Sequence, residues 1–370
     1  MKAQHLFTYD NRTGHLFRIP DCPDNVTLDL TWRCNYRCSF CYNTDDSRRR
    51  GDPPWEATDR LLRELASWGV REILYLGGEP LLHSKFDNVM ELGSDLGFRQ
   101  RVVTNGSTVT KPRARLLARH SVEVGVSLHS AERSVHNWIT RSPEGFSETL
   151  AGLECLLSAR AKTFVQYSPT RHDPDGLSRL TAFLADRYAG AICFIDVNRL
   201  LPFGEAANDP ERVIPQSDEC WSVLRQIGRS VASGWSIRAE SYPHCWVRAR
   251  ARSDGLDDQA TGAILSTLRP CYMGINQLAF DPLGRVKLCP AGPPLAGPMG
   301  IGELADYWVN SALLCRRRAD VSAPCCLAED AGIRLCRWFY SCLGGCRSAA
   351  ISPNAGDPLR IGPDTEACDK

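Results

Sequence analysis

Apolar and polar positions follow two periods along the first half of the chain. Six short runs rich in Val, Ile and Leu have the length and composition of strands, at residues 26–31, 72–77, 101–104, 123–128, 163–167 and 191–197. Between them, segments such as 56–68 and 146–159 repeat apolar residues every three or four positions, which predicts amphipathic helices. Buried strands that alternate with helices form a parallel sheet with the helices outside. We therefore predict an α/β fold over residues 25–204, a partial (βα)6 barrel similar to an incomplete TIM barrel.

The pattern changes after residue 204. Residues 205–270 are polar with helical spacing, which predicts a helical linker with an exposed loop at 248–259. From residue 271 onward the chain is rich in Cys, Gly and Pro and has few long periodic segments. Such a region buries little apolar surface and needs another source of stability, such as bound metal clusters. The sequence thus predicts an N-terminal extension at 1–24 and a small cysteine-rich domain at 271–370.

Composition narrows the classes of partner. The formal net charge of +1 gives no sign of a polyanionic partner, so we expect neither nucleic-acid nor membrane binding. No run reaches the roughly 18 apolar residues of a membrane span. Residues 1–20 lack the apolar core of a signal peptide. These features predict a cytoplasmic protein.

The seventeen cysteines are the strongest chemical signal. Three of them, Cys34, Cys38 and Cys41, form a CxxxCxxC loop, and most of the others lie after residue 270. Disulfides are rare in the reducing cytoplasm, so metal or cluster ligation explains so many thiols best. Three thiolates in one short loop fit a 4Fe–4S cubane that leaves one iron open for chemistry. The alternatives are a zinc site with a distant fourth ligand and three unrelated core cysteines.

Further polar signals stand at the ends of the predicted strands. Gly77-Gly78-Glu79-Pro80 ends the second strand; its glycines let the backbone approach a ligand, and Glu79 offers a carboxylate to a cationic amine. Asn105 follows the third strand, Ser127 ends the fourth, and Arg141 follows after a short helix. The carboxyl ends of parallel strands meet at one edge of a sheet. We expect these residues to gather beside the cysteine loop.

In this order, the motifs over residues 25–200 resemble the radical S-adenosylmethionine (SAM) superfamily. The resemblance implies that the three cysteines hold a 4Fe–4S cluster whose open iron binds SAM. An electron from an external reductant, such as flavodoxin or ferredoxin, then yields a 5′-deoxyadenosyl radical that abstracts a substrate hydrogen. The resemblance also assigns SAM contacts to Phe40, Gly78, Glu79, Asn105, Ser127, Arg141 and Leu201. His129 stands where many relatives carry an aspartate.

The tail resembles the SPASM extension of this superfamily, which carries two auxiliary 4Fe–4S clusters. By correspondence, the first cluster takes Cys271, Cys289 and Cys346, and the second takes Cys336, Cys342, Cys368 and either Cys325 or Cys326. The fourth ligand is unusual because Ile333 stands where the family has a cysteine. An incomplete second cluster and a zinc ribbon are the alternatives. Cys245 lies outside both patterns and is a candidate hydrogen-atom donor.

Enzymes of the SPASM group modify ribosomally made peptides or small molecules. We predict oxidative modification, such as crosslinking, of a ribosomally made peptide in natural-product or antibiotic biosynthesis. Only about twenty-five residues precede the first strand, which counts against a peptide substrate unless a separate protein recognises the peptide. One alternative is oxidation, decarboxylation or epimerisation of a sugar or aminocyclitol. An alternative of another class is a non-catalytic iron–sulfur electron carrier.

Overall fold

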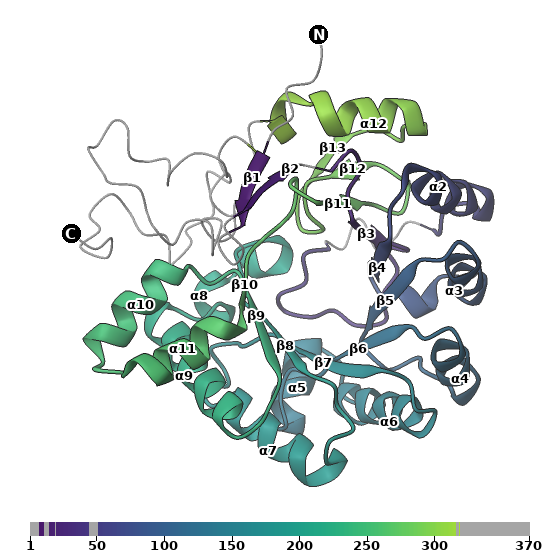
Figure 1. Cartoon of the computed structure of the whole chain (residues 1–370). Helices are drawn as coiled ribbons and strands as arrows, with labels where there is room; N and C mark the ends of the chain where they lie inside the picture. The colour runs from purple at the N-terminus through teal and green to yellow at the C-terminus, as the bar shows by residue number, and fades with distance from the viewer. Residues whose placement is uncertain (1–6, 11–14, 19, 44–50, 316–317, 319–370) are drawn as a thin grey trace.

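One curved sheet surrounded by helices forms the described part of the chain (Figure 1). The computed structural model describes residues 7–10, 15–18, 20–43, 51–315 and 318. A separate antiparallel pair, β1 (Phe7–Asp10) and β2 (His15–Arg18), precedes this sheet. The sheet's first eight strands in chain order are β3 (Asn25–Asp29), β4 (Glu72–Leu76), β5 (Arg99–Thr104), β6 (Glu123–Ser127), β7 (Thr163–Tyr167), β8 (Ile195–Asn198), β9 (Ile237–Glu240) and β10 (Leu268–Arg269). They lie side by side in chain order, and every pair is parallel.

The predicted fold class is confirmed. All six predicted strands overlap β3 to β8, and the predicted helices correspond to α2 (Trp55–Trp68) and α6 (Gly145–Ser158). Between the strands lie α3 (Phe86–Asp95), α4 (Lys111–Arg119), α5 (Arg133–Thr140), α7 (Gly176–Tyr188) and two 3-10 turns, η1 (Pro80–Leu82) and η2 (Gly204–Ala207). The outer helices follow the rim of the open barrel (Figure 1). They bury apolar stripes such as Leu62 and Leu65 of α2 against the strands.

The region between 205 and 270 contributes strands as well as helices. Its helices are α8 (Pro210–Val213), α9 (Ser217–Ala232), α10 (His244–Ser253) and α11 (Asp258–Thr267), and β9 and β10 extend the barrel sheet between them. The loop predicted at 248–259 is wrong for most of its length, because α10 continues to Ser253 and α11 begins at Asp258. Val247 and Ala251 of α10 are buried four residues apart, so this stretch is an amphipathic helix despite its arginines.

The chain then crosses to the opposite end of the parallel sheet. β10 is its edge strand on one side, whereas β11 (Gln277–Phe280) pairs in parallel with β3 on the other. Eight residue steps join Arg269 to Gln277, so this segment spans at most about 28 Å across the barrel opening. β11 continues as an antiparallel ribbon with β12 (Val286–Lys287) and β13 (Pro294–Ala296). The predicted turn at 281–284 joins β11 to β12, with Gly284 at φ +74°.

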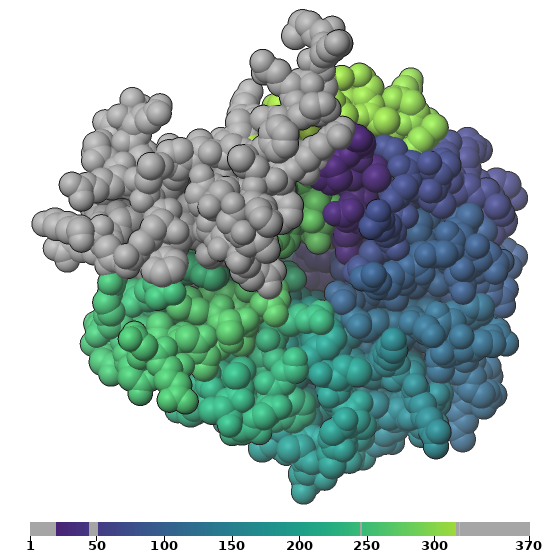
Figure 2. All heavy atoms as spheres, viewed as in Figure 1, coloured from purple at the N-terminus to yellow at the C-terminus, as the bar shows by residue number. Residues whose placement is uncertain are grey.

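The last described helix packs against the first barrel helix. α12 (Ile301–Asn310) lies beside α2, and the rings of Trp308 and Trp68 meet edge to face with their centroids 6.3 Å apart. Figure 2 shows the surfaces of these two helices in contact. The domain boundaries expected at 24, 204 and 270 remain predictions. Cys325, Cys326, Cys336, Cys342, Cys346 and Cys368 lie outside the described residues.

Candidate active site

The cysteine loop lies directly after β3, at the carboxyl edge of the sheet. Backbone hydrogen bonds fix it to the end of α5: Arg37 N–H donates to the Thr140 carbonyl (3.1 Å), and Ser39 N–H donates to the Ile139 carbonyl (2.8 Å). The side chains of Cys34, Cys38 and Cys41 all line one cavity of about 170 Å³. The fold therefore brings the three predicted thiols to one space.

The residues that line this cavity suit an iron–sulfur cluster better than a single metal ion. Within the described ranges, no three Cys, His, Asp or Glu side chains are grouped to hold a single metal ion. A cubane cluster binds each thiolate through a different iron, so its ligands need not surround one ion. Three thiols around one cavity, beside a buried carboxyl group and two glycines, fit a cluster and a cationic cofactor.

The glycine turn after β4 packs against the start of the cysteine loop. Gly78 N–H donates to the Thr31 carbonyl and Glu79 N–H donates to the Arg33 carbonyl, both at 2.7 Å. A Cβ at Gly78 would lie 2.1 Å from the Arg33 carbonyl oxygen, so only glycine fits there. Gly77 adopts φ +134°, which a residue with a side chain rarely adopts. The two glycines thus set the distance between the turn and the loop.

Glu79 places a buried carboxyl group on the cavity. Only 1% of the residue is exposed, and it accepts hydrogen bonds from Leu81 N (3.1 Å), Thr104 Oγ1 (2.7 Å) and Asn105 N (2.7 Å). Burial raises the pKa of Glu79 to about 7, although these hydrogen bonds act in the opposite direction. A cation that enters the cavity would favour the ionised carboxylate. The site is therefore suited to an ammonium group.

Phe40 and His129 form a wall of the same cavity. Their rings meet edge to face with centroids 4.9 Å apart, and His129 is buried. Ser168 N–H donates to Nδ1 of His129 (3.3 Å), so the proton of the neutral ring is on Nε2. Burial, with a smaller contribution from His136, lowers the pKa of His129 to about 3. This histidine is neutral at physiological pH.

The barrel strands supply the remaining polar lining. Asn105 and Ser127 line the cavity, and so do Gln166, near the end of β7, and Ser168 just after it. Asn105 is held by hydrogen bonds between its Nδ2 and Asn35 Oδ1 (2.9 Å) and between Ser107 N and its Oδ1 (2.9 Å). The cysteine loop, the glycine turn and four strand ends therefore meet at one place.

The part of the chain that forms this site matches a known protein family. Residues 29–170 match the family model described as the radical SAM superfamily. Residues 29–170 therefore form a radical SAM domain. Enzymes of this superfamily use SAM together with a 4Fe–4S cluster, and the cavity described above provides ligands suited to both.

Two relatives match nearly the whole length of this chain. Mycofactocin maturase MftC of Mycobacterium ulcerans is 28% identical over 355 residues, which cover 94% of this chain and 88% of the relative. AdoMet-dependent heme synthase of Methanosarcina barkeri is 24% identical over 94% of this chain and 97% of its own length.

Two solved structures share the fold. SuiB of Streptococcus suis bound to the precursor peptide SuiA has a TM-score of 0.69 and 16% identity, covering 95% of this chain and 77% of its own. The enzyme anSMEcpe with bound AdoMet and a peptide has a TM-score of 0.63 and 16% identity, covering 88% and 89%. At these identities the likeness supports the partial barrel rather than a particular reaction.

The residues predicted to contact SAM fall into two groups in the structure. Phe40, Gly78, Glu79, Asn105 and Ser127 line the cavity. Arg141 and Leu201 are not among its lining residues, and each has a partner nearby: Arg141 Nη1 lies 3.4 Å from Glu205 Oε2, and the Leu201 carbonyl accepts from Phe203 N (2.7 Å). The roles of all seven in SAM binding remain predictions.

The segment around Leu201 nevertheless contacts the cysteine loop. Glu205 N–H donates to the Cys41 carbonyl (2.8 Å), and a Cβ at Gly204 would lie 2.3 Å from the same oxygen. The chain leaving the sixth barrel strand is thus packed against the third cysteine. Cys245 is the second residue of α10, but its side chain lies outside the described part, so its role as a hydrogen donor is untested.

Two of the predicted auxiliary ligands, Cys271 and Cys289, lie among the described residues. Cys271 follows the edge strand β10, and Cys289 follows β12. Tyr42 lies near residues of both parts of the chain. Burial is the largest cause of its raised pKa, and the negative charges of Asp29, Cys41 and Cys289 raise it further. Its phenol therefore lies within electrostatic reach of Cys41, from the predicted SAM cluster, and of Cys289, from the first predicted auxiliary cluster. Whether Cys271 and Cys289 share a cluster remains a prediction.

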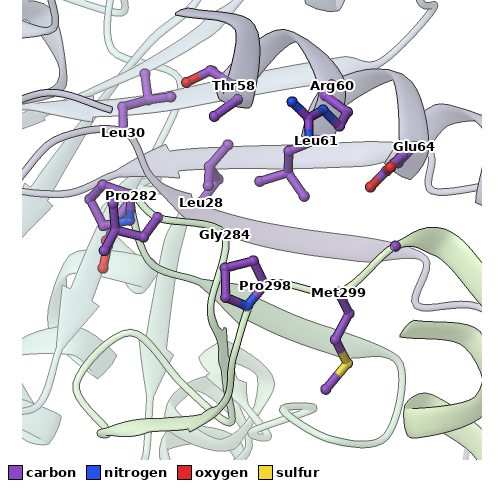
Figure 3. Close-up of a pocket in the computed structure, with 14 residues that line it drawn as sticks. Leu28, Leu30, Thr58, Arg60, Leu61, Glu64, Pro282, Gly284, Pro298 and Met299 are labelled. Atoms are coloured by element: carbon purple, nitrogen blue, oxygen red, sulfur yellow. The ribbon is translucent and has the colours of Figure 1, made fainter. Parts of the chain in front are cut away.

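A second cavity of about 220 Å³ lies between α2, β3 and the β11–β12 turn. Figure 3 shows Leu28, Leu61, Pro282 and Met299 around it, with Arg60 and Glu64 at one side. None of the described residues that line it is a cysteine or a histidine. The cysteine cavity is therefore the better candidate for the active site.

Proposed function

We propose that this chain is a radical SAM maturase that oxidatively modifies a ribosomally made peptide. The observation that carries the chemistry is the single cavity shared by Cys34, Cys38, Cys41 and the buried Glu79. The peptide substrate is supported by the relatives, since MftC is a maturase and SuiB was solved with its precursor peptide. Crosslinking of side chains in natural-product biosynthesis is the reaction we favour.

The chain's own residues would prepare this chemistry. A cluster and SAM bound in the cavity supply reductive cleavage of SAM and hydrogen abstraction from the substrate. Glu79 would accept a hydrogen bond from the methionyl amino group of SAM, and Gly78 keeps the backbone close enough for that contact. Phe40 and His129 would close the side of the cavity against water, which would otherwise react with radical intermediates.

The cysteine-rich tail completes the proposal. We assign residues 271–370 to a SPASM domain with two auxiliary clusters, which would accept the second electron of an oxidation. The reductant would be a flavodoxin or ferredoxin, and a separate protein would present the peptide. In the part of the chain that the structure describes, no helix has the length and apolar character of a membrane span. We propose a cytoplasmic location for the enzyme.

A small-molecule substrate is the second candidate. The heme synthase of Methanosarcina barkeri matches 94% of this chain and 97% of its own length, which shows that a related chain of similar extent acts in a synthesis of a different kind. A sugar, an aminocyclitol or another small molecule would enter the same barrel.

Anaerobic reconstitution tests the proposal. With SAM and dithionite, the wild-type protein should release 5′-deoxyadenosine, and Cys38→Ala should release none. Adding a candidate precursor peptide should give a product two hydrogens lighter by mass spectrometry. An electron carrier would leave SAM intact in every sample. Consumption of a sugar but of no peptide would favour the small-molecule alternative.

A further inference from the structure

One row of the barrel interior continues from the cofactor cavity to an unpartnered carboxyl group. Across adjacent parallel strands, Ser127 pairs with Gln166, Gln166 with Asp196, and Asp196 with Arg238. Residues paired in this way present their side chains on the same face of a sheet. Ser127 and Gln166 line the cavity, so Asp196 and Arg238 also face the barrel interior. With strands about 4.8 Å apart, Asp196 lies about 10 Å from Ser127.

Asp196 is 9% exposed, and its side chain makes no hydrogen bond or ion pair with any described residue. Its Oδ1 atom is fully buried and has no partner. A buried carboxyl group without a partner is costly, and each such group in a native protein has a specific cause, such as a ligand that completes its hydrogen bonds. Asp196 is therefore a stronger indication of a binding site than an exposed acidic residue would be.

The charged groups that face Asp196 are largely engaged elsewhere. Arg101 and Glu123 form an ion pair at 2.5 Å. Arg269 donates from Nη1 to the Ser266 carbonyl (3.0 Å) and the Leu268 carbonyl (3.1 Å). Glu240, on β9 one row further, places a second carboxyl group near Asp196.

Arg238 packs on the aromatic floor of the barrel. Its Cζ lies 3.8 Å from the ring centroid of Phe194, which stacks on Phe164 at 4.5 Å. Gly125 makes room for this pair, since a Cβ there would lie 2.3 Å from Cζ of Phe164. The two rings share the inward face with Gln166 and Asp196 and lie two residues deeper. The floor is therefore aromatic, with the guanidinium groups of Arg238 and Arg101 over its rings, and Asp196 lies one row above it.

We propose that Asp196 anchors a substrate subsite for a primary ammonium group, next to the place where SAM would bind. This inference rests on the proposed function and specifies the substrate it takes. A lysine side chain of a peptide and an amino group of an aminosugar carry the same cation. The carbon atoms beside that ammonium would then lie near the nucleoside of SAM, where hydrogen abstraction occurs.

Matched deuterated probes test the subsite in the reconstituted enzyme. The peptide pair is N-acetyl-lysinamide and N-acetyl-norleucinamide, and the sugar pair is glucosamine and glucose. Deuterium transferred to 5′-deoxyadenosine is measured by mass spectrometry, and binding without reductant is measured by saturation-transfer NMR. We expect at least tenfold more transfer and stronger binding from one ammonium probe than from its neutral partner. The pair that shows the difference identifies the source of the ammonium.

Variants separate a binding role from a structural one. Asp196→Asn should lose the preference for the ammonium probe, Asp196→Glu should keep part of it, and the surface control Asp218→Asn should behave as wild type. If Asp196→Asn lowers only the melting temperature and keeps the preference, Asp196 is merely structural and the proposal is wrong.

Two failures can be told apart. A wild-type enzyme that makes 5′-deoxyadenosine but treats both members of each pair alike, in transfer and in binding, overturns the subsite alone. A protein that makes no 5′-deoxyadenosine overturns the proposed function, and the NMR comparison still decides whether the ammonium binds.

Discussion

Lys287 and Asp29 form a buried pair that joins the first barrel strand to the ribbon after the barrel. Lys287 Nζ lies 3.5 Å from Asp29 Oδ2, and the two side chains are 8% and 1% exposed. Tyr42 donates a hydrogen bond to the other Asp29 oxygen (3.0 Å), and Lys287 also donates to the Pro290 carbonyl. Burial raises the pKa of Asp29 to about 6, while Lys287 and Tyr42 favour its ionised form. Residues near both ends of the described chain thus depend on one another.

Removing one partner of this pair should destabilise the protein. Lys287→Met leaves Asp29 buried with Tyr42 as its one partner among the described residues, and we expect a loss of about 3 kcal/mol in the free energy of unfolding. Asp29→Asn combined with Lys287→Met removes both charges and should recover much of the loss. Urea denaturation of the cluster-free protein measures both. An unchanged midpoint for the single variant would show that the pair contributes nothing.

Gly78 should tolerate no side chain. Gly78→Ala places a methyl group 2.1 Å from the Arg33 carbonyl oxygen, and neither backbone can move without breaking the 2.7 Å bonds between the two loops. We expect a stability loss of about 2 kcal/mol and weaker SAM binding. The control Gly262→Ala lies in α11 with open space around it and should stabilise the helix by about 0.5–1 kcal/mol. Equal melting temperatures for both variants would contradict the close packing.

Affinity for SAM should depend on pH through Glu79. Burial raises the pKa of Glu79 to about 7 in the ligand-free site, and the ionised carboxylate is the stronger acceptor for the N–H groups of the SAM amino group. As the pH falls below 7 the carboxyl group is protonated, so Kd at pH 6 should be about tenfold higher than at pH 8. Isothermal titration calorimetry measures this. Glu79→Gln should bind weakly at every pH. Affinity that rises toward low pH would exclude this role.

The iron content of cysteine variants should show whether Cys289 is a ligand of an auxiliary cluster. If Cys289 holds a cluster separate from that of Cys34, Cys38 and Cys41, Cys289→Ala loses about four irons and keeps SAM cleavage, whereas Cys38→Ala loses both the irons and the cleavage. Iron and sulfide counts after anaerobic reconstitution measure this. Cys155→Ala, on α6, is the matched control and should keep the full iron content. Loss of SAM cleavage in Cys289→Ala with unchanged iron would assign Cys289 to another role.

The spacing of apolar residues predicts the parallel core and the ends of its strands, because buried strands and amphipathic helices differ in that spacing. Five of the seven residues expected to contact SAM line the cavity, since motifs at strand ends meet at one edge. The strands β9, β10 and β11 were missed because they are two to four residues long and pair with distant segments.

The inner row of the barrel could not be predicted from sequence. Gln166 and Asp196 lie inside the predicted strands at 163–167 and 191–197. Alternation along a strand separates its side chains into two faces, but it does not show which face points into the barrel. The strand register with Ser127 shows that Gln166 and Asp196 are on the inward face. The contact of Arg141 with SAM stays a prediction, and its Nη1 atom lies 3.4 Å from Glu205 Oε2.

Magnetic resonance of the reduced enzyme tests the central claim most directly. The claim is that the cavity of Cys34, Cys38, Cys41 and Glu79 holds a cluster with an open iron that binds SAM. With SAM labelled with 15N at its amino group, electron–nuclear double resonance should show coupling between that nitrogen and the cluster. The coupling should persist in Cys289→Ala and disappear in Cys38→Ala. A wild-type cluster whose spectrum is unchanged by SAM, with no nitrogen coupling, would contradict the account.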